Sequence, residues 1–230
     1  MSTRLIIDDH HQLQEERKSD FPQQPLPVKL VAKIISYVFH PLFIPVYLSW
    51  FLVRIQPYLF SSFSDWDKTM VMIRFIVMYT FFPLVTVLLA KGLGFLRSIY
   101  LETQRDRIIP YVACGVYYFW MWYVLRNQPE FPAMVIKLTL AIFIASSIGL
   151  IANIYMKISM HAIAVGVMVA FMMLLSFSQS VNFGIYLSIA LLVAGLVCTS
   201  RFIVSDHTQR EVYGGLLLGI ASQLVAYWLG

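Results

Sequence analysis

Long apolar stretches dominate this sequence, and several approach or exceed the roughly 18–20 residues that a helix needs to cross a bilayer. Apolar residues make up 59% of the chain and charged residues 13%, and the charges cluster between the apolar stretches. Because these stretches are continuous rather than alternating, they predict helices. The sequence therefore predicts an all-α fold, a polytopic transmembrane helical bundle.

We expect a polar N-terminal tail, residues 1–28, followed by a single transmembrane helical domain, residues 29–230. The tail has no apolar stretch before residue 30, so no cleavable signal peptide is expected. We predict six to seven spans, at about 30–53, 69–90, 108–125, 133–155, 161–178, 181–199 and 212–229. The first is the weakest, because Pro41 and Pro45 would bend it or make it re-entrant.

The net charge of +5 comes from Lys and Arg residues that lie mostly in the tail and the loops. This placement indicates membrane topology and anionic ligands, and we expect no nucleic-acid partner. Cys114 and Cys198 fall inside apolar stretches and are predicted to be inert core residues. His40 precedes Pro41. A hydrogen-bonded histidine at a helix kink is the favoured interpretation, and a cavity-lining role is the alternative.

The most informative polar segment lies between the last two predicted spans and contains Arg201, His207 and Glu211. If a helix begins at about Asp206, His207 and Glu211 lie one turn apart on one face. A carboxylate bonded to one imidazole nitrogen leaves the other free to attack, and a guanidinium matches phosphate oxygens. These are the groups that phosphoryl transfer needs. The alternative is an ion pair at a helix start, with Asp206 and Arg210 also paired.

Two further polar clusters interrupt the apolar stretches. Ser159 and His161, next to Lys157, precede the fifth span, where a serine is most often an N-cap. A helix N-terminus also attracts anions, and a histidine there is a candidate proton donor to a departing alkoxide. Arg105 and Arg107 precede the third span and indicate either phosphate contacts or a topology signal.

Two predicted crossings separate each cluster from the next along the chain. All three clusters are therefore expected on the same side of the membrane, whether or not the first span crosses. That side carries the excess of Lys and Arg, which predicts that it faces the cytoplasm.

The segment Ser200-Arg201-x5-His207-x3-Glu211 resembles the motif S-R-x5-H-x3-D of the type 2 phosphatidic acid phosphatase (PAP2) superfamily, a family of membrane lipid phosphatases. Glu replaces the family's Asp. The resemblance extends over about residues 97–215. It implies a PAP2-like core in a multi-pass protein of the cell (inner) membrane.

The other two family motifs are less complete. The segment Ile158-Ser159-Met160-His161 keeps the Ser and His of P-S-G-H. The motif K-x6-R-P corresponds to arginines upstream of Pro110, but no Lys or Arg stands seven residues before either of them.

The resemblance implies a metal-independent lipid phosphate phosphatase without a cofactor. His207 would attack phosphorus and form a phosphohistidine, Glu211 would orient His207, and His161 would protonate the leaving oxygen. The implied substrates are phosphatidate, phosphatidylglycerol phosphate or a polyprenyl (di)phosphate. The residues implied to bind phosphate are Arg201, Ser159, Arg105, Arg107 and Lys157.

Three alternatives stay open at this point. The chain could be a catalytically inactive, lipid-binding relative of the family, or a small transporter with His161, His207 and Glu211 on an ion path. The same three residues could instead hold a metal ion, although three nearby arginines disfavour a cation.

Overall fold

The computed structural model describes residues 5–7, 13–15, 24–56, 58–96, 98–101, 103–178, 183–204 and 207–230. Most of the predicted tail, together with Asp206, lies outside these residues. Strands β1 (Leu5–Ile7) and β2 (Leu13–Glu15) form a short antiparallel pair in the tail. The rest is helical: α1 (Leu26–Val38), α2 (Ile44–Trp50), α3 (Asp65–Ile76), α4 (Phe82–Gly92), α5 (Ile108–Arg126), α6 (Ala133–Tyr155), α7 (Met160–Ser178), α8 (Gly184–Val204) and α9 (Gln209–Leu229), with π-helical segments η2 (Phe51–Ile55) and η3 (Val77–Phe81).

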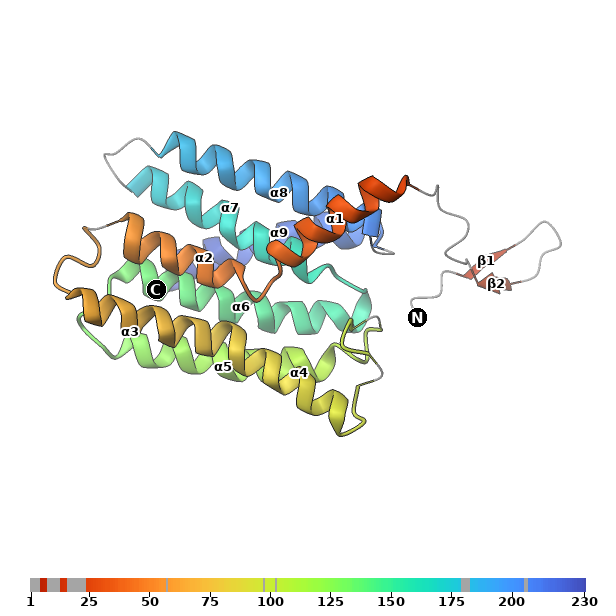
Figure 1. Cartoon of the computed structure of the whole chain (residues 1–230), viewed down its shortest axis with the longest axis horizontal. Helices are drawn as coiled ribbons and strands as arrows, with labels where there is room; N and C mark the ends of the chain where they lie inside the picture. The colour runs from red at the N-terminus through yellow and green to blue at the C-terminus, as the bar shows by residue number, and fades with distance from the viewer. Residues whose placement is uncertain are drawn as a thin grey trace.

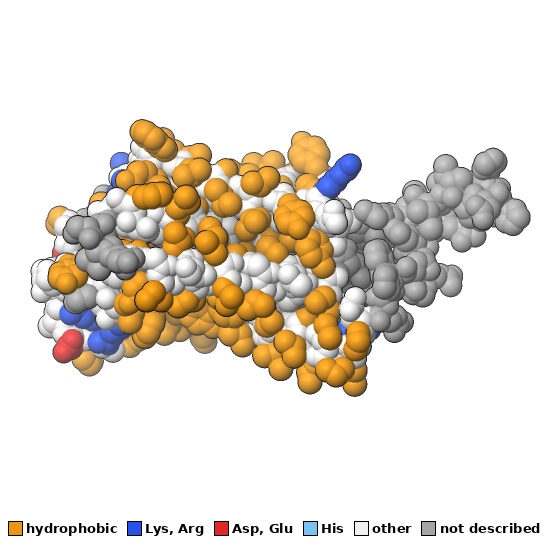
Figure 2. Space-filling model, turned by 90° about the horizontal axis from the view of Figure 1, so that it is seen from above, with side chains coloured by type: hydrophobic (Ala, Val, Ile, Leu, Met, Phe, Trp, Pro, Cys, Tyr) orange, Lys and Arg blue, Asp and Glu red, His pale blue; other side chains and the backbone are white. Residues whose placement is uncertain are grey.

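The predicted helical membrane bundle is confirmed. In the described part of the chain, six helices are long and apolar enough to cross a membrane. They are the continuous helix Asp65–Gly92, formed by α3, η3 and α4, and the single helices α5, α6, α7, α8 and α9. These helices lie lengthwise beside one another (Figure 1). On the face seen in Figure 2, hydrophobic side chains cover most of the length and charged side chains lie toward the two ends.

The first predicted span, at about 30–53, is not one helix. It is divided into α1 and the short apolar helix Ile44–Ile55, with a non-helical segment at residues 39–43 between them. Pro41 accounts for this break, because proline has no N–H and clashes with the preceding helical turn. Figure 1 shows α1 and α2 following each other along the bundle, so the break lies against the packed helices rather than beyond them.

Side chains satisfy backbone groups that this break leaves without helical partners. The Tyr47 hydroxyl donates to the carbonyl of Val38 (2.8 Å). The Thr80 hydroxyl donates to the carbonyl of Leu42 (3.0 Å), whose own N–H donates to His40 Nδ1 (3.3 Å). Non-helical backbone at membrane depth is tolerated where it is buried in protein or lines a cavity, and both conditions are met here.

Helices α7 and α9 pack backbone to backbone through glycines. A Cβ atom added to Gly219 of α9 would overlap the carbonyl oxygen of Ile163, and one added to Gly166 of α7 would overlap that of Leu216. A Cβ on Gly215 would lie 2.8 Å from the carbonyl oxygen of Ser159. Such close approach of small residues is a common way for membrane helices to associate.

This contact brings the starts of α7 and α9 together. The N–H of Ser159, just before α7, donates to the carbonyl of Glu211 in the first turn of α9 (3.1 Å). Helix α7 is also the most central span. Of the 18-residue apolar stretch in each helix, 56% is buried in α7 and 33% in α9. The α7–α9 contact therefore fixes where the residues before each helix can lie.

We expect Gly219→Ala to destabilise the protein by about 1–3 kcal/mol, because the added methyl group meets backbone that cannot move aside. The matched control is Gly214→Ala on the same helix, where an added Cβ has nothing within 4 Å. Thermal unfolding in detergent would measure both. Equal melting temperatures for the two variants would contradict the close α7–α9 contact.

Candidate active site

A cavity of about 990 Å³ lies at the end of the bundle where α7 and α9 begin. Residues from all three polar clusters line it: Arg107, Lys157, His161, Arg201 and His207. The three clusters, which were expected on one side of the membrane, therefore contribute residues to one cavity. Although four membrane-spanning helices, α5 to α8, separate the first of these residues from the last, they line one space.

His207 and Glu211 form the central pair of this site. Glu211 Oε2 lies 3.1 Å from His207 Nδ1, and both side chains are buried. The same oxygen accepts the N–H of Thr208 (2.9 Å), while the Thr208 hydroxyl accepts the N–H of Glu211 (3.3 Å). This reciprocal pair is a capping box, so Glu211 starts the helix and orients the histidine at once.

The prediction that a helix begins at about Asp206 is not supported by the described residues, because α9 begins at Gln209 and His207 precedes its N-cap, Thr208. The i, i+4 contact forms nevertheless, since the carboxylate folds back over the N-cap. The longer Glu suits this geometry, because a capping box normally uses Glu or Gln at this position.

The environment of His207 favours its neutral form. Burial lowers the pKa of His207 below its usual value of 6.5, and the positive charges of Arg107 and Arg201 lower it further. The hydrogen bond that His207 donates to Glu211 opposes this shift in the pKa and only partly offsets it. A neutral imidazole that donates its Nδ1–H to the carboxylate carries a lone pair on Nε2, the state that a nitrogen nucleophile requires.

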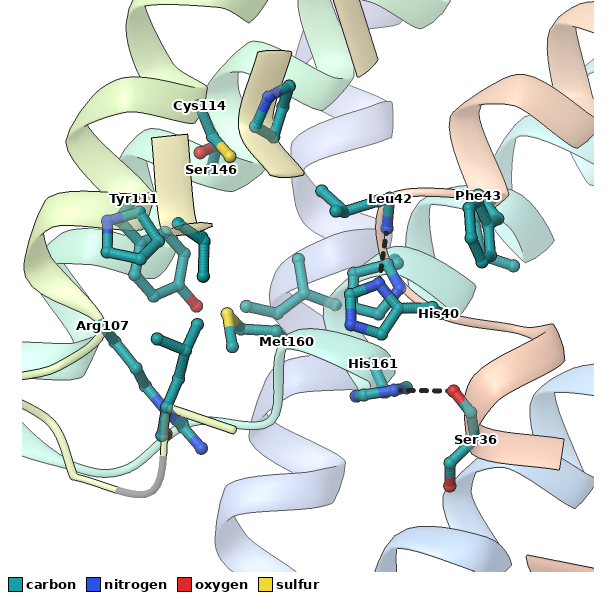
Figure 3. Close-up of a pocket in the computed structure, with 18 of the residues that line it drawn as sticks. Ser36, His40, Leu42, Phe43, Arg107, Tyr111, Cys114, Ser146, Met160 and His161 are labelled. Carbon is teal, nitrogen blue, oxygen red and sulfur yellow. Dashed lines mark hydrogen bonds between the residues drawn. The ribbon is translucent and has the colours of Figure 1, made fainter. Parts of the chain in front are cut away.

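His161 meets the end of the broken helix. Its Nε2 lies 3.1 Å from the carbonyl oxygen of Ser36 in the last turn of α1 (Figure 3). A carbonyl oxygen can only accept a hydrogen bond, so Nε2 of His161 carries a proton. Nδ1 is then the ring nitrogen that can gain or lose a proton. The His40 ring packs edge-on against that of His161, with 5.3 Å between ring centroids.

The two lining arginines differ in their contacts. Arg107 is buried and donates from Nε to the carbonyl of Leu101 (3.0 Å) and from Nη1 to that of Ile158 (2.8 Å). It thereby ties the segment before α5 to the segment before α7. Leu101 has a φ of 52°, uncommon for a bulky residue, beside this arginine. Arg201 donates from Nη1 to the hydroxyl of Ser36 (3.3 Å).

Two residues that the resemblance implied for phosphate binding do not line the cavity. Arg105 is exposed. Ser159 is fully buried, and its hydroxyl accepts the N–H of Ala162 (3.4 Å), which is the N-cap contact expected as the structural alternative. Lys157 is half-buried and does line the cavity.

Several lining residues escaped the sequence analysis. Ser36 carries no motif, and only its contacts with His161 and Arg201 reveal it. His40, in contrast, was named from the sequence because it precedes Pro41, and it is both the hydrogen-bonded kink histidine and a lining residue. Tyr111 lines the cavity one turn inside α5, and no sequence pattern marks it.

The far part of the cavity is apolar. Its buried wall is formed by Tyr118 of α5, Ile142 and Ala145 of α6, and Val167 of α7. Other lining residues are exposed on the outside of the bundle and mark the mouth of the cavity, which opens sideways between the α1–α2 break and α4. These are Tyr37, Phe43, Leu84, Leu88, Ile99 and Tyr100. The cavity thus joins a cationic end to an apolar slot that opens laterally.

No group of three or more His, Cys, Asp or Glu side chains suited to a metal ion occurs within the part of the chain that the structure describes. Comparison with protein families, curated proteins and solved structures gives no match for this chain. The resemblance to the PAP2 superfamily therefore rests on the segment Ser200–Glu211 and on two less complete motifs.

We expect His207 to titrate below pH 6.5, because burial and two arginines disfavour its charged form. Replacing Glu211 by Gln removes the group that raises this pKa, so the titration should move to still lower pH. Histidine side-chain ¹⁵N NMR in detergent would measure it, with His207→Gln to assign the signal. Titration at or above pH 6.5 would contradict the buried, arginine-flanked site.

Proposed function

We propose that this protein is an integral-membrane lipid phosphate phosphatase that acts through a phosphohistidine. The observation that supports this most is the oriented His207–Glu211 pair on the cavity that Arg107, Arg201 and His161 also line. The groups that would serve as nucleophile, orienting carboxylate and phosphate contacts thus lie together at one cavity. The PAP2-like core and motif resemblance belong to the same proposal.

In the first step, His207 Nε2 attacks phosphorus in line with the ester oxygen. The N–P bond forms as the P–O bond breaks, and the departing alkoxide takes a proton from Nδ1 of cationic His161. The carbonyl of Ser36 accepts from His161 Nε2, which helps hold the ring in place and stabilises its charged form. Glu211 stabilises the positive charge that develops on His207.

In the second step, water attacks the phosphohistidine. His161, now neutral, takes a proton from that water through Nδ1, the N–P bond breaks, and phosphate leaves. The cycle restores both histidines and consumes one water for each ester bond broken. These steps use no metal ion or cofactor.

Arg107, Arg201 and Lys157 are proposed to neutralise the phosphate oxygens, since all three line the cavity. Phosphoryl transfer depends mainly on such positioning and charge stabilisation. Arg105 and Ser159 are not included, because neither lines the cavity. The hydrocarbon part of the lipid would lie in the apolar slot and enter through the lateral mouth.

The chain is a multi-pass membrane protein by its six spans. We further propose that it lies in the cell (inner) membrane with the site facing the cytoplasm. The support for this orientation is the excess of Lys and Arg on the side of the three clusters.

A lipid-binding protein without turnover is the second candidate. It is favoured by the existing contacts of the cavity groups, since Arg107 already donates to two carbonyls and His161 to one. A phosphate-release assay of the purified protein across phosphatidate, phosphatidylglycerol phosphate and polyprenyl (di)phosphates separates the candidates. Binding without release from any of these lipids would favour the second.

We expect His207→Ala to abolish turnover, because it removes the attacking nitrogen. Glu211→Gln should lower kcat by about 10²- to 10⁴-fold, more than it raises KM, because the carboxylate acts mainly on the developing imidazolium. Glu211→Asp is the matched control, since it keeps a carboxylate at this position and should retain more activity than Glu211→Gln. Normal turnover by His207→Ala would remove the nucleophile from the proposal.

Orthovanadate should inhibit the enzyme competitively with the lipid phosphate, because it can form a five-coordinate adduct with a nucleophile in place of phosphorus. The inhibition constant should rise in Arg201→Gln, which loses a charge that faces the oxygens. Steady-state kinetics in mixed micelles would test this. Activity that is insensitive to millimolar-scale vanadate would count against attack by a protein nucleophile.

A further inference from the structure

His40 lies in the break between α1 and α2 and lines the cavity, but none of the proposed steps uses it. Its Nδ1 accepts the N–H of Leu42 (3.3 Å). A backbone N–H can only donate, so Nδ1 carries no proton and the ring carries its one proton on Nε2. The turn at Pro41 therefore fixes which nitrogen of His40 is the hydrogen-bond donor.

This donor nitrogen faces the cavity. Among the described residues nothing accepts a hydrogen bond from Nε2 of His40, and the surrounding protein atoms do not enclose this nitrogen completely. Figure 3 shows it turned away from Leu42, toward the space beside Met160 and His161. The residue is half-buried, and a polar group in such a place normally has a partner, so its N–H offers a position for a ligand oxygen.

The groups around His40 suit an anionic ligand. Its ring packs edge-on against that of His161, with 5.3 Å between ring centroids. His161 contacts the carbonyl of Ser36, and Arg201 donates to the hydroxyl of the same serine. A hydrogen bond from nitrogen to oxygen spans about 2.7–3.2 Å, so two rings this close can both reach oxygens of one phosphate group.

A neutral donor suits this position better than a cationic one. In the first proposed step His161 is cationic, and a second positive charge directly beside it would disfavour that form. His40 adds a donor without adding a charge, because the N–H of Leu42 faces Nδ1 and opposes a second proton on the ring.

The cavity otherwise lacks the neutral side-chain donor that the resemblance implied. That residue was Ser159, which is fully buried, accepts the N–H of Ala162 and does not line the cavity. The implied phosphate contacts that do line the cavity are Arg107, Lys157 and Arg201, which are all cationic side chains. His40 brings a neutral donor to the same space from a different part of the fold.

We propose that His40 donates a hydrogen bond from Nε2 to a non-bridging oxygen of the bound phosphate group. It is then a further phosphate-binding residue, and it lies outside all three motifs. The proposal rests on the proposed function and adds a residue to its site, while the steps at phosphorus remain those of His207 and His161. Because the contact is to the phosphate group itself, inorganic phosphate should make it as well.

The test compares His40→Asn with His40→Gln, which both remove the ring. Asparagine commonly accepts the N–H two residues further on, so its side-chain oxygen can replace Nδ1 as the acceptor for Leu42. Its NH₂ group does not extend to the place of Nε2. Glutamine is one carbon longer and can bring its NH₂ group there, but its oxygen no longer meets the N–H of Leu42. One variant therefore keeps the turn, and the other keeps the donor.

Three quantities would be measured on the purified protein in detergent: the Kd of inorganic phosphate by calorimetric titration, kcat/KM for phosphate release from phosphatidate, and the melting temperature. We expect His40→Asn to weaken phosphate binding and to lower kcat/KM by about 10- to 100-fold each, the effect of one hydrogen bond to a charged group. Its melting temperature should stay near that of the wild type. His40→Gln should lose less binding and less activity, although its melting temperature should be the lower of the two.

Two outcomes would overturn the proposal. Phosphate binding by His40→Asn that equals the wild type would remove His40 from the phosphate contacts, and equal losses in both variants would assign the effect to the ring itself. A wild type that binds phosphate but releases none from the lipid, with weaker binding in His40→Asn, would refute the phosphatase function and support the His40 contact. A wild type that binds no phosphate and releases none, although it is folded, would refute both.

Discussion

The close backbone contact between α7 and α9 is the constraint on which the candidate site depends. Glycines 166, 215 and 219 remove the side chains that would keep the two helices apart. The N–H of Ser159 can therefore reach the carbonyl of Glu211, and the starts of the two helices are joined. His161 follows one of these starts and His207 precedes the other, so a packing feature of the bundle places both imidazoles on one cavity.

A second constraint is the broken first span. Its interruption at residues 39–43 leaves polar backbone groups beside the site, and a side chain of the site forms a hydrogen bond with one of them. The Ser36 carbonyl holds His161, while the Ser36 hydroxyl accepts from Arg201 and lies 3.1 Å from that of Ser200. The same break contributes to the lateral mouth of the cavity. One irregular segment therefore both contacts the catalytic groups that we propose and borders the mouth of the cavity.

Much of this arrangement could be predicted from the sequence, because it depends on local patterns. Hydropathy located the spans from α5 to α9, and the spacing of His207 and Glu211 predicted their pairing. The sequence could not reveal the partner of His161, since Ser36 lies 125 residues away and has no motif. Nor could it choose between Arg105 and Arg107, because the choice depends on which one turns inward just before α5 begins.

The most direct test of the proposed function is to trap the covalent intermediate. Purified protein would be mixed with a ³²P-labelled diacylglycerol phosphate, quenched in alkali, where phosphohistidine survives, and digested to map the label. The proposed chemistry predicts label on His207 of the wild type and none in His207→Ala. Phosphate release by the wild type with no labelled protein at any time, or with label on a residue other than His207, would contradict it.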